Sequence, residues 1–430
     1  MSSKLLPPQK GEALFQSAPI QESSDVLPQS NKLSIENGRS WSIATGVLLI
    51  LTFSYGAPLI TVIALKQIAA DLDTPRSVVA LASSLVWLGS GLGAIGFGRV
   101  ADRIGFNRTA SIGAAAIGIG LVLSSVVING TQLVAVHLLL IGVLGSGAIN
   151  IPMMVYISRW FDRRRGSALA FVSSGQYLAG AVWPAVITIG IEHAGWRQTM
   201  LWLGLLTAAA IIPVAMNALA PAPEKAGSIV PDGPGHGQDA IAGLSPPVIF
   251  SLLCLAGFLC CIPMAMPLSH LVALCSDAGI GTSQGALMLS LLLGSAFISR
   301  QFWGWLSDRV GGLWAVLSGS AFQAAAIAGF VWTQDEAGLF ALSALFGLGY
   351  SGIIPAYVVA LRNLFPSGEA SWRVPIWFFV NLCGMAFGAW FAGFIYDNQL
   401  SYAPAFAAGL AFNIANLVVM GFLVYRQARH

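Results

Sequence analysis

One basic residue lies deep inside an otherwise apolar segment of this 430-residue chain. Arg300 stands eight residues before Asp308, where the apolar segment ends, and eight residues span about 12 Å along a helix. Placing a guanidinium in apolar surroundings costs on the order of 3 kcal/mol unless it faces a cavity or has an anionic partner. The long apolar segments contain no aspartate or glutamate. We therefore expect the counter-ion to be a bound small molecule, most simply a carboxylate held by two parallel hydrogen bonds.

A structural role for Arg300 is the alternative. Its long side chain could extend to water at the nearer end of the segment, or brace a helix against backbone carbonyls. We favour anion binding because charges buried in apolar segments are usually functional. Other polar side chains in these segments could line the same site, or could equally form hydrogen bonds between helices. These candidates are Tyr55, Asn150, Tyr156, Gln176, Tyr177, Tyr350, Tyr357 and Asn381.

A histidine is the side chain best suited to exchange a proton near neutral pH. His270 lies near the end of an apolar segment, shortly before Asp277, and is a candidate for coupling proton movement to ligand binding. It could equally be a capping or hydrated residue. The absence of buried carboxylates argues against a proton relay within the protein, so a carboxylate ligand could carry the proton itself.

The pattern G-x-x-x-D-R-x-G occurs twice, at residues 98–105 and 304–311, and each copy follows a long apolar run. Two copies at a fixed offset indicate two structural halves. A carboxylate at such a helix end can accept hydrogen bonds from the start of a neighbouring helix or pair with an arginine. The alternative is that these charges only set the orientation of the chain in the membrane, but aspartate contributes little to that orientation. The residues that we predict to form a gate at this face are Asp102, Arg103, Arg108, Asp308 and Arg309.

The composition is that of a membrane protein, with 56% hydrophobic and only 9% charged residues. Crossing a bilayer takes about 20 apolar residues, and the chain offers twelve such segments. We therefore predict an all-α polytopic membrane protein whose twelve transmembrane helices form two pseudo-symmetric six-helix bundles. The predicted spans are 43–66, 78–98, 109–129, 132–158, 166–190, 198–219, 247–272, 282–306, 312–332, 337–363, 374–396 and 402–425.

The hydrophilic stretch after the sixth span has the composition of a linker. The predicted organisation is a disordered tail over 1–40, a bundle over 41–220, a linker over 221–245, a bundle over 246–425 and a short tail over 426–430. Most arginines fall on one face, together with the tails and the linker, so we expect this face to be cytoplasmic and the protein to lie in the cell (inner) membrane.

Several function classes are excluded. The chain has no P-loop and no hydrolase or metalloprotease motif, so we expect neither an enzyme nor a bound cofactor. The five cysteines lack metal-site spacing, and a net charge of +3 gives no reason to expect nucleic acid. The expected partners are a small anionic substrate and the lipid bilayer, and we expect the chain to work as a monomer.

The two D-R loops in a six-plus-six chain resemble those of the major facilitator superfamily. Within it, the run S-R-W-F-D-R-R-R-G-S-A-L-A at residues 158–170, and Gly195-Trp196-Arg197, are similar to segments of the monocarboxylate transporters and oxalate/formate antiporters. This resemblance implies that Arg300 corresponds to the anion-binding arginine of span 8, and that spans 1 and 11, with Tyr55 and Asn381, face the cavity. Span 11 lacks the lysine of the oxalate transporter, which favours a monocarboxylate.

The sequence thus predicts a secondary transporter that moves a small organic anion by alternating access, coupled to protons or to anion exchange. A drug or metabolite exporter of the same superfamily is the alternative within the class. A transporter-like membrane sensor is the alternative outside it. In the first half the position equivalent to Arg300 is Ala94, so the two halves match at the repeated loops and differ at the buried charge.

Overall fold

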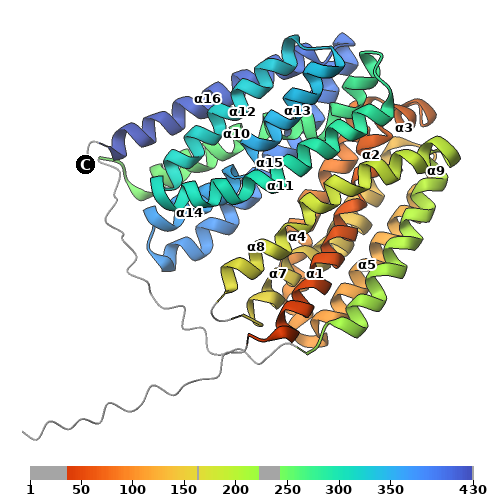
Figure 1. The fold of residues 1–430 in the computed structure, drawn as a ribbon, viewed down its shortest axis with the longest axis horizontal. Coiled ribbons are helices and arrows are strands. Elements are labelled where there is room, and N and C mark those ends of the chain that lie inside the picture. Colours follow the sequence, from red (N-terminus) through yellow and green to blue (C-terminus); the bar gives the residue numbers. More distant parts are fainter. Residues whose placement is uncertain (1–35, 162–163, 222–242, 429–430) are drawn as a thin grey trace, which may run out of the picture. The chain divides into compact units, whose positions relative to one another are not determined.

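Backbone groups inside a bilayer must be hydrogen bonded internally, which a helix achieves within a single segment. The computed structural model describes residues 36–161, 164–221 and 243–428, and every regular element in these ranges is a helix (Figure 1). The all-α fold class is therefore confirmed. Residues 1–35 of the predicted N-terminal tail and nearly all of the predicted linker lie outside the described residues. The tail was predicted to extend to residue 40, but the first helix begins at Gly38.

The helices of the first half precede residue 221, and those of the second half follow residue 243. The first half contains α1 (Gly38–Gly56), α2 (Leu59–Ile63), α3 (Leu65–Asp71), α4 (Arg76–Ile104), α5 (Phe106–Ser124), α6 (Gly130–Val136), the π-helix η1 (His137–Ser146), α7 (Gly147–Ser158), α8 (Arg165–Ser173) and α9 (Gly175–Ala218). The second half contains α10 (Pro246–Asp277), α11 (Thr282–Val310), α12 (Gly312–Trp332), α13 (Glu336–Tyr350), α14 (Ile353–Leu364), α15 (Ser367–Gln399) and α16 (Ala403–Gln427).

Eleven helical stretches of the described residues are long and apolar enough to cross a membrane. One of them, Ser167–Ala218, contains the non-helical Gly195, whose φ of +76° breaks the helix between two spans. Each side of this break exceeds the length of about 20 residues that a span requires. Residues 36–161, 164–221 and 243–428 thus contain twelve helical segments long and apolar enough to be the predicted membrane helices, six in each half.

The repeated motif ends in the same backbone geometry in both halves. Gly105 closes the first copy with a φ of +93°, and Gly311 closes the second with a φ of +85°. Both values lie in the region that favours glycine, and both turns join two membrane helices within one residue. The final glycine of the pattern is therefore required by the turn.

Two helix pairs make the most extensive contacts between the halves. Helix α4 packs against α15, and α9 packs against α11. Small residues allow these helices to approach closely, as is usual between membrane helices. A Cβ atom on Gly393 of α15 would lie 2.6 Å from the Cα of Ser77 in α4, and a Cβ on Gly180 of α9 would lie 2.7 Å from the Cβ of Leu293 in α11.

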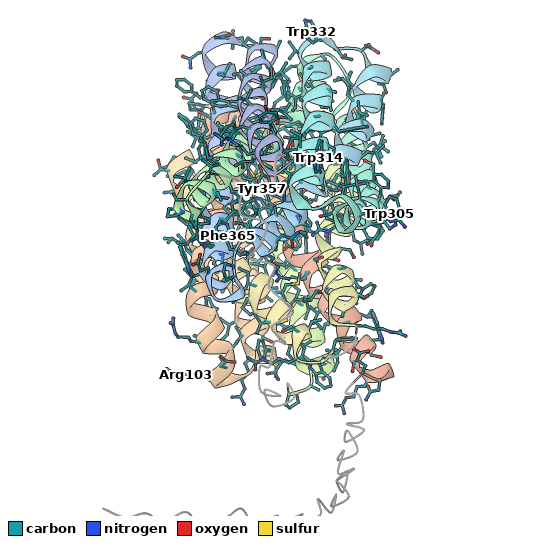
Figure 2. All side chains as sticks on the ribbon, turned by 90° about the vertical axis from the view of Figure 1, so that its left-hand side faces the viewer. Arg103, Trp305, Trp314, Trp332, Tyr357 and Phe365 are labelled. Carbon is teal, nitrogen blue, oxygen red and sulfur yellow. The ribbon has the colours of Figure 1, made fainter. Side chains whose placement is uncertain are left out.

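Large apolar side chains cover the outside of the helices. Trp305 and Trp332 are 50% and 75% exposed, and both lie at the edge of the side-chain view in Figure 2. Such exposure would be costly in water and suits a surface in contact with lipid.

Successive spans run in opposite directions, so each bundle has two ends. We call the end that holds the first residue of α1 and the last residue of α16 the terminal end, and the opposite one the far end. Residues of the far end include Lys66, Arg76, Asp277, Asp397 and Tyr402; those of the terminal end include Asp102, Arg159, Arg309 and Arg373.

Candidate functional site

A cavity of about 530 Å³ is bounded by helices of both halves. It lies beside the two helix pairs that join the halves, with walls from α1, α4 and α9 on one side and from α10, α11, α14 and α15 on the other. Its lining includes six of the candidates predicted from sequence, Arg300 among them, and several apolar side chains. The lining residues include Tyr55, Trp87, Gln176, Tyr177, Leu293, Met264, Leu268, Arg300, Tyr350, Phe378, Asn381 and Met385.

Arg300 is the positive charge of this cavity. A guanidinium nitrogen of Arg300 donates a hydrogen bond of 2.7 Å to the phenolic oxygen of Tyr177, and the guanidinium carbon lies 5.2 Å from the centre of that ring. None of the described lining residues is acidic, and Arg300 forms no ion pair with any described carboxylate. The cavity therefore presents a half-buried cation to whatever enters it.

Three tyrosines line the same cavity as this charge. Besides Tyr177, these are Tyr55 and Tyr350. Tyr55 is stacked on Trp87 of α4, with ring centres 5.4 Å apart and planes at 26°. Trp87 was not predicted from sequence, because no pattern separates a tryptophan facing a cavity from one facing lipid.

Two amide side chains also belong to the wall. Asn381 is almost fully buried; its amide nitrogen donates to the carbonyl of Trp377 at 2.9 Å, and its amide oxygen accepts from the Cys261 thiol at 3.6 Å. Gln176 precedes Tyr177 on α9 and is half-buried. Both residues line the cavity, as predicted, although Asn381 is held within the wall by its own hydrogen bonds.

Three of the other polar candidates lie between helices instead of in the cavity lining. Asn150 donates to the Ser90 hydroxyl at 3.2 Å and accepts from the Ser54 hydroxyl at 3.5 Å, so it joins α7 to α4 and α1. Tyr156 donates to the carbonyl of Ala220, and Tyr357 donates to the Asn416 amide oxygen. Asn150 and Tyr357 thus form the helix-to-helix hydrogen bonds that the sequence left as an alternative, and Tyr156 binds the segment that follows α9.

His270 is fully buried next to the far end. Its Nε2 lies 2.8 Å from the carbonyl of Ala389, and its Nδ1 lies 3.1 Å from the Tyr402 hydroxyl. A carbonyl only accepts, so Nε2 carries a proton, and Nδ1 can accept from the Tyr402 hydroxyl. Burial raises the pKa of Tyr402, which keeps that hydroxyl protonated. His270 is absent from the cavity lining, whereas its neighbour Ser269 is part of it.

The far end carries ionic contacts between the halves that the sequence did not predict. Arg76, at the start of α4, contacts the Asp277 carboxylate through two nitrogens at 2.5 and 3.1 Å, and Lys66 contacts the same carboxylate at 2.7 Å. The Asp397 carboxylate of α15 accepts hydrogen bonds from the backbone N–H groups of Arg76 and Ser77 at 2.9 and 3.0 Å.

At the terminal end, the gate candidates whose side chains are described differ from one another in their surroundings. Asp102 pairs with Arg159 at 2.6 Å, and this contact stays within the first half. Arg103 and Arg108 are exposed, and Arg309 lies over the ring of Trp305 at 4.3 Å. The side chain of Asp308 lies outside the described part of the structure. Arg159 was not among the predicted gate residues.

A metal site is not apparent among the described residues, since none of their His, Cys, Asp and Glu side chains form a group of three or more. The described geometry instead offers an apolar cavity with one cation and several phenolic hydroxyls. Such a site can bind a small anion by hydrogen bonds and charge without doing covalent chemistry.

Comparison with known proteins gives a consistent result. The family model of the Major Facilitator Superfamily matches residues 44–335 and 253–430. The MFS-type transporter YcxA of Bacillus subtilis (strain 168) is 25% identical over 354 residues, which are 78% of this chain and 83% of that protein. Monocarboxylate transporter 13 of Bos taurus is 26% identical over 279 residues, which are 63% of this chain and 62% of that protein.

Solved structures show the same fold. A bacterial homolog of the human lysosomal transporter Spinster, in an inward-facing and unoccupied conformation, has a TM-score of 0.66 at 16% identity, over 91% of this chain and 96% of that one. A variant of the nucleoside transporter NupG has a TM-score of 0.67 at 14% identity, over 89% and 98% of the two chains. With twelve membrane helices, a central cavity and a family match over most of its length, the chain belongs to the Major Facilitator Superfamily of membrane transporters.

Proposed function

We propose that this protein is a secondary transporter of organic anions of the monocarboxylate class. The observation that carries the proposal is Arg300, a cation in the central cavity that has no carboxylate partner among the described residues. An unpaired charge in such surroundings is costly unless an anion joins it. The similarity to monocarboxylate transporter 13 supports the same class of cargo.

The hydrogen bond between Arg300 and Tyr177 prepares a site for a carboxylate. The Tyr177 oxygen accepts from Arg300, so its own O–H is directed elsewhere and can donate to the cargo. The other guanidinium N–H groups can donate to the same carboxylate, in the two-bond geometry that arginine favours.

The charge in the wall matches a single carboxylate. The segment of α15 from Val374 to Tyr396, which supplies Phe378, Asn381 and Met385 to the wall, contains no lysine or arginine. A dicarboxylate would leave its second charge beside apolar side chains, which is unfavourable. The proposed cargo therefore carries one carboxylate.

Transport follows by alternating access between the two halves. The contacts of Asp277 and Asp397 join the far ends of the two halves. We therefore assign this conformation to the state in which the cavity is closed at the far end. Because basic residues concentrate at the terminal end, we place that end in the cytoplasm of a cell (inner) membrane. Coupling is to protons, carried by the cargo or through His270, or to exchange of a second anion.

The test is uptake of radiolabelled carboxylates into proteoliposomes, with and without a pH gradient. We expect Arg300→Ala to abolish uptake, and Arg300→Lys to keep only part of it because the two-bond geometry is lost. Arg362→Ala is the matched control, since Arg362 is an exposed arginine in the last turn of α14 and is not part of the cavity lining.

Three outcomes would contradict the proposal. Unaltered uptake in Arg300→Ala would remove the role of the cation. Neutral or cationic compounds moving as well as carboxylates would favour the exporter alternative. Ligand binding without any flux would favour the membrane sensor.

A further inference from the structure

The cavity is much larger than a small monocarboxylate needs. Propionate takes the space of about four water molecules, roughly 120 Å³ at about 30 Å³ each. The cavity measures about 530 Å³, within the range of pockets that bind ligands of drug size. A three-carbon acid at Arg300 would leave most of the apolar wall in contact with water.

The phenolic hydroxyls of the wall belong to the same cavity as Arg300. Tyr55, Tyr177 and Tyr350 all line it, and the Tyr177 oxygen accepts a hydrogen bond from the guanidinium. Two serines of the wall are already engaged in hydrogen bonds. The hydroxyls of Ser83 and Ser84 donate to the carbonyl of Ala80, each at 2.8 Å.

Much of the remaining wall consists of flexible apolar side chains and an aromatic ring. Met264, Leu268 and Met385 contribute flexible apolar side chains from α10 and α15, and Phe378 adds a ring. Methionines adapt to irregular shapes and make favourable contacts with aromatic rings. A cargo that fills this part of the cavity must carry an apolar body in addition to its charge.

An aromatic surface forms part of the wall of the cavity that holds the charged group. Tyr55 and Trp87 line the same cavity as Arg300, and the two rings are stacked with their centres 5.4 Å apart. Trp87 is half-buried. A flat ring attached to a carboxylate by one or two bonds would contact Tyr55 and Trp87 while its carboxylate met Arg300.

We propose that the cargo is a monocarboxylate with a bulky, flat apolar body, of the arylcarboxylic or arylacetic acid class, with Trp87 and Tyr55 as the surface that selects the body. This inference rests on the proposed function. It adds to that function the recognition of the apolar body of the cargo, besides its carboxylate.

The first experiment compares cargos on the wild-type protein and needs no variant. Uptake into proteoliposomes is measured for propionate, cyclohexanecarboxylate and phenylacetate, with phenylacetamide as a neutral competitor. We expect phenylacetate to have a KM at least about tenfold below that of propionate, because burying a ring is worth more than one decade of affinity. Cyclohexanecarboxylate should fall between the two, because it has bulk without a flat aromatic face.

The second experiment changes the aromatic surface. Trp87→Leu should raise the KM for phenylacetate about three- to tenfold and leave that for propionate unchanged, and Trp87→Phe should retain most of the wild-type preference. Trp202→Leu is the matched control, because Trp202 lies on α9 and is 59% exposed on the outer surface.

The outcomes separate this inference from the proposed function. Equal KM values for propionate and phenylacetate in the wild type, or a Trp87→Leu effect that is the same for both, would overturn the inference and leave an anion transporter in place. Competition by phenylacetamide as strong as that by unlabelled phenylacetate would show that the charge is not used and would overturn the proposed function.

Discussion

At the scale of single residues, Arg300 and Tyr177 define the part of the site that meets charge. The hydrogen-bond partner of the cation is a phenol and not a carboxylate, so its charge is not neutralised by this contact. A carboxylate partner would neutralise Arg300 permanently, and the cargo would then have to displace it. A phenol leaves the charge available and adds a donor.

Tyr177→Phe tests this arrangement. The variant keeps the ring and the packing but removes the hydroxyl that accepts from Arg300 and is directed at the cargo. Hydrogen bonds to charged groups contribute about 1.5–3 kcal/mol, so we expect the KM for phenylacetate to rise by about tenfold or more. Tyr425→Phe, on the exposed end of α16, should transport like the wild type. An unchanged KM in Tyr177→Phe would mean that its hydroxyl does not contact the cargo.

The sequence predicted some of these residues for a clear physical reason. A charge inside an apolar segment needs a partner whichever way the helix is rotated, so Arg300 could be identified without a structure. The role of an uncharged polar residue depends on which way the helix is rotated, so it could not be identified in this way. Asn381 lines the cavity, whereas Asn150 joins three helices, and nothing in their sequence context separates the two.

At the scale of elements, the contact between α15 and α4 is a helix cap supplied by the other half. The Asp397 carboxylate accepts from two N–H groups in the first turn of α4, where a helix has unsatisfied donors and a partial positive charge. The close approach at Gly393 places the two helices within reach of this contact.

Asp397→Ala should therefore loosen the start of α4. Losing such a cap costs about 1 kcal/mol, so we expect faster hydrogen exchange in the first turn of α4 and a smaller population with the far end closed. Asp335→Ala is a matched control, because Asp335 caps α13 at Gly338 with a bond of 2.8 Å inside the second half. This control should speed exchange at α13 only. Equal effects of both variants at α4 would contradict the assignment.

The spans themselves were predictable to within a few residues, and this too has a physical cause. The bilayer fixes a minimum length of apolar sequence, and short polar turns separate the helices. The ten-residue π-helix η1 was not predicted, because a change from one helical hydrogen-bond pattern to another leaves no mark in apolar composition.

At the scale of the whole molecule, the far end is held closed by side chains that are distant in the chain. Lys66 and Arg76 meet Asp277 across roughly half of the sequence. Such pairs could not be predicted, because they depend on how the two bundles are placed against each other. The cations were visible in sequence, but their partner was not.

Asp277→Asn tests this closure. Partly exposed ion pairs contribute about 0–1 kcal/mol each, so losing two should shift the closed population by up to about 30-fold. The measurement is the distance between spin labels at Asp73 and Leu400, on exposed far-end turns of opposite halves, in a variant whose native cysteines are replaced. We expect longer and broader distances.

Asp71→Asn provides the control for this experiment. Asp71 pairs with Arg197 at 2.9 Å at the same end, but both residues belong to the first half. Its loss should leave the label distances unchanged. A shift in Asp71→Asn as large as that in Asp277→Asn would show that the far end responds to charge in general and not to the contacts between halves.

The Asp397 contact also bears on how this protein can vary among relatives. The carboxylate binds backbone N–H groups, so any residue except proline at positions 76 and 77 would preserve both hydrogen bonds. Side chains there can drift without weakening the cap, and the positions need not change together with 397. Paired substitutions would reveal the Arg76–Asp277 contact in a set of aligned sequences, whereas the cap beside it would leave only an invariant acid with no covarying partner.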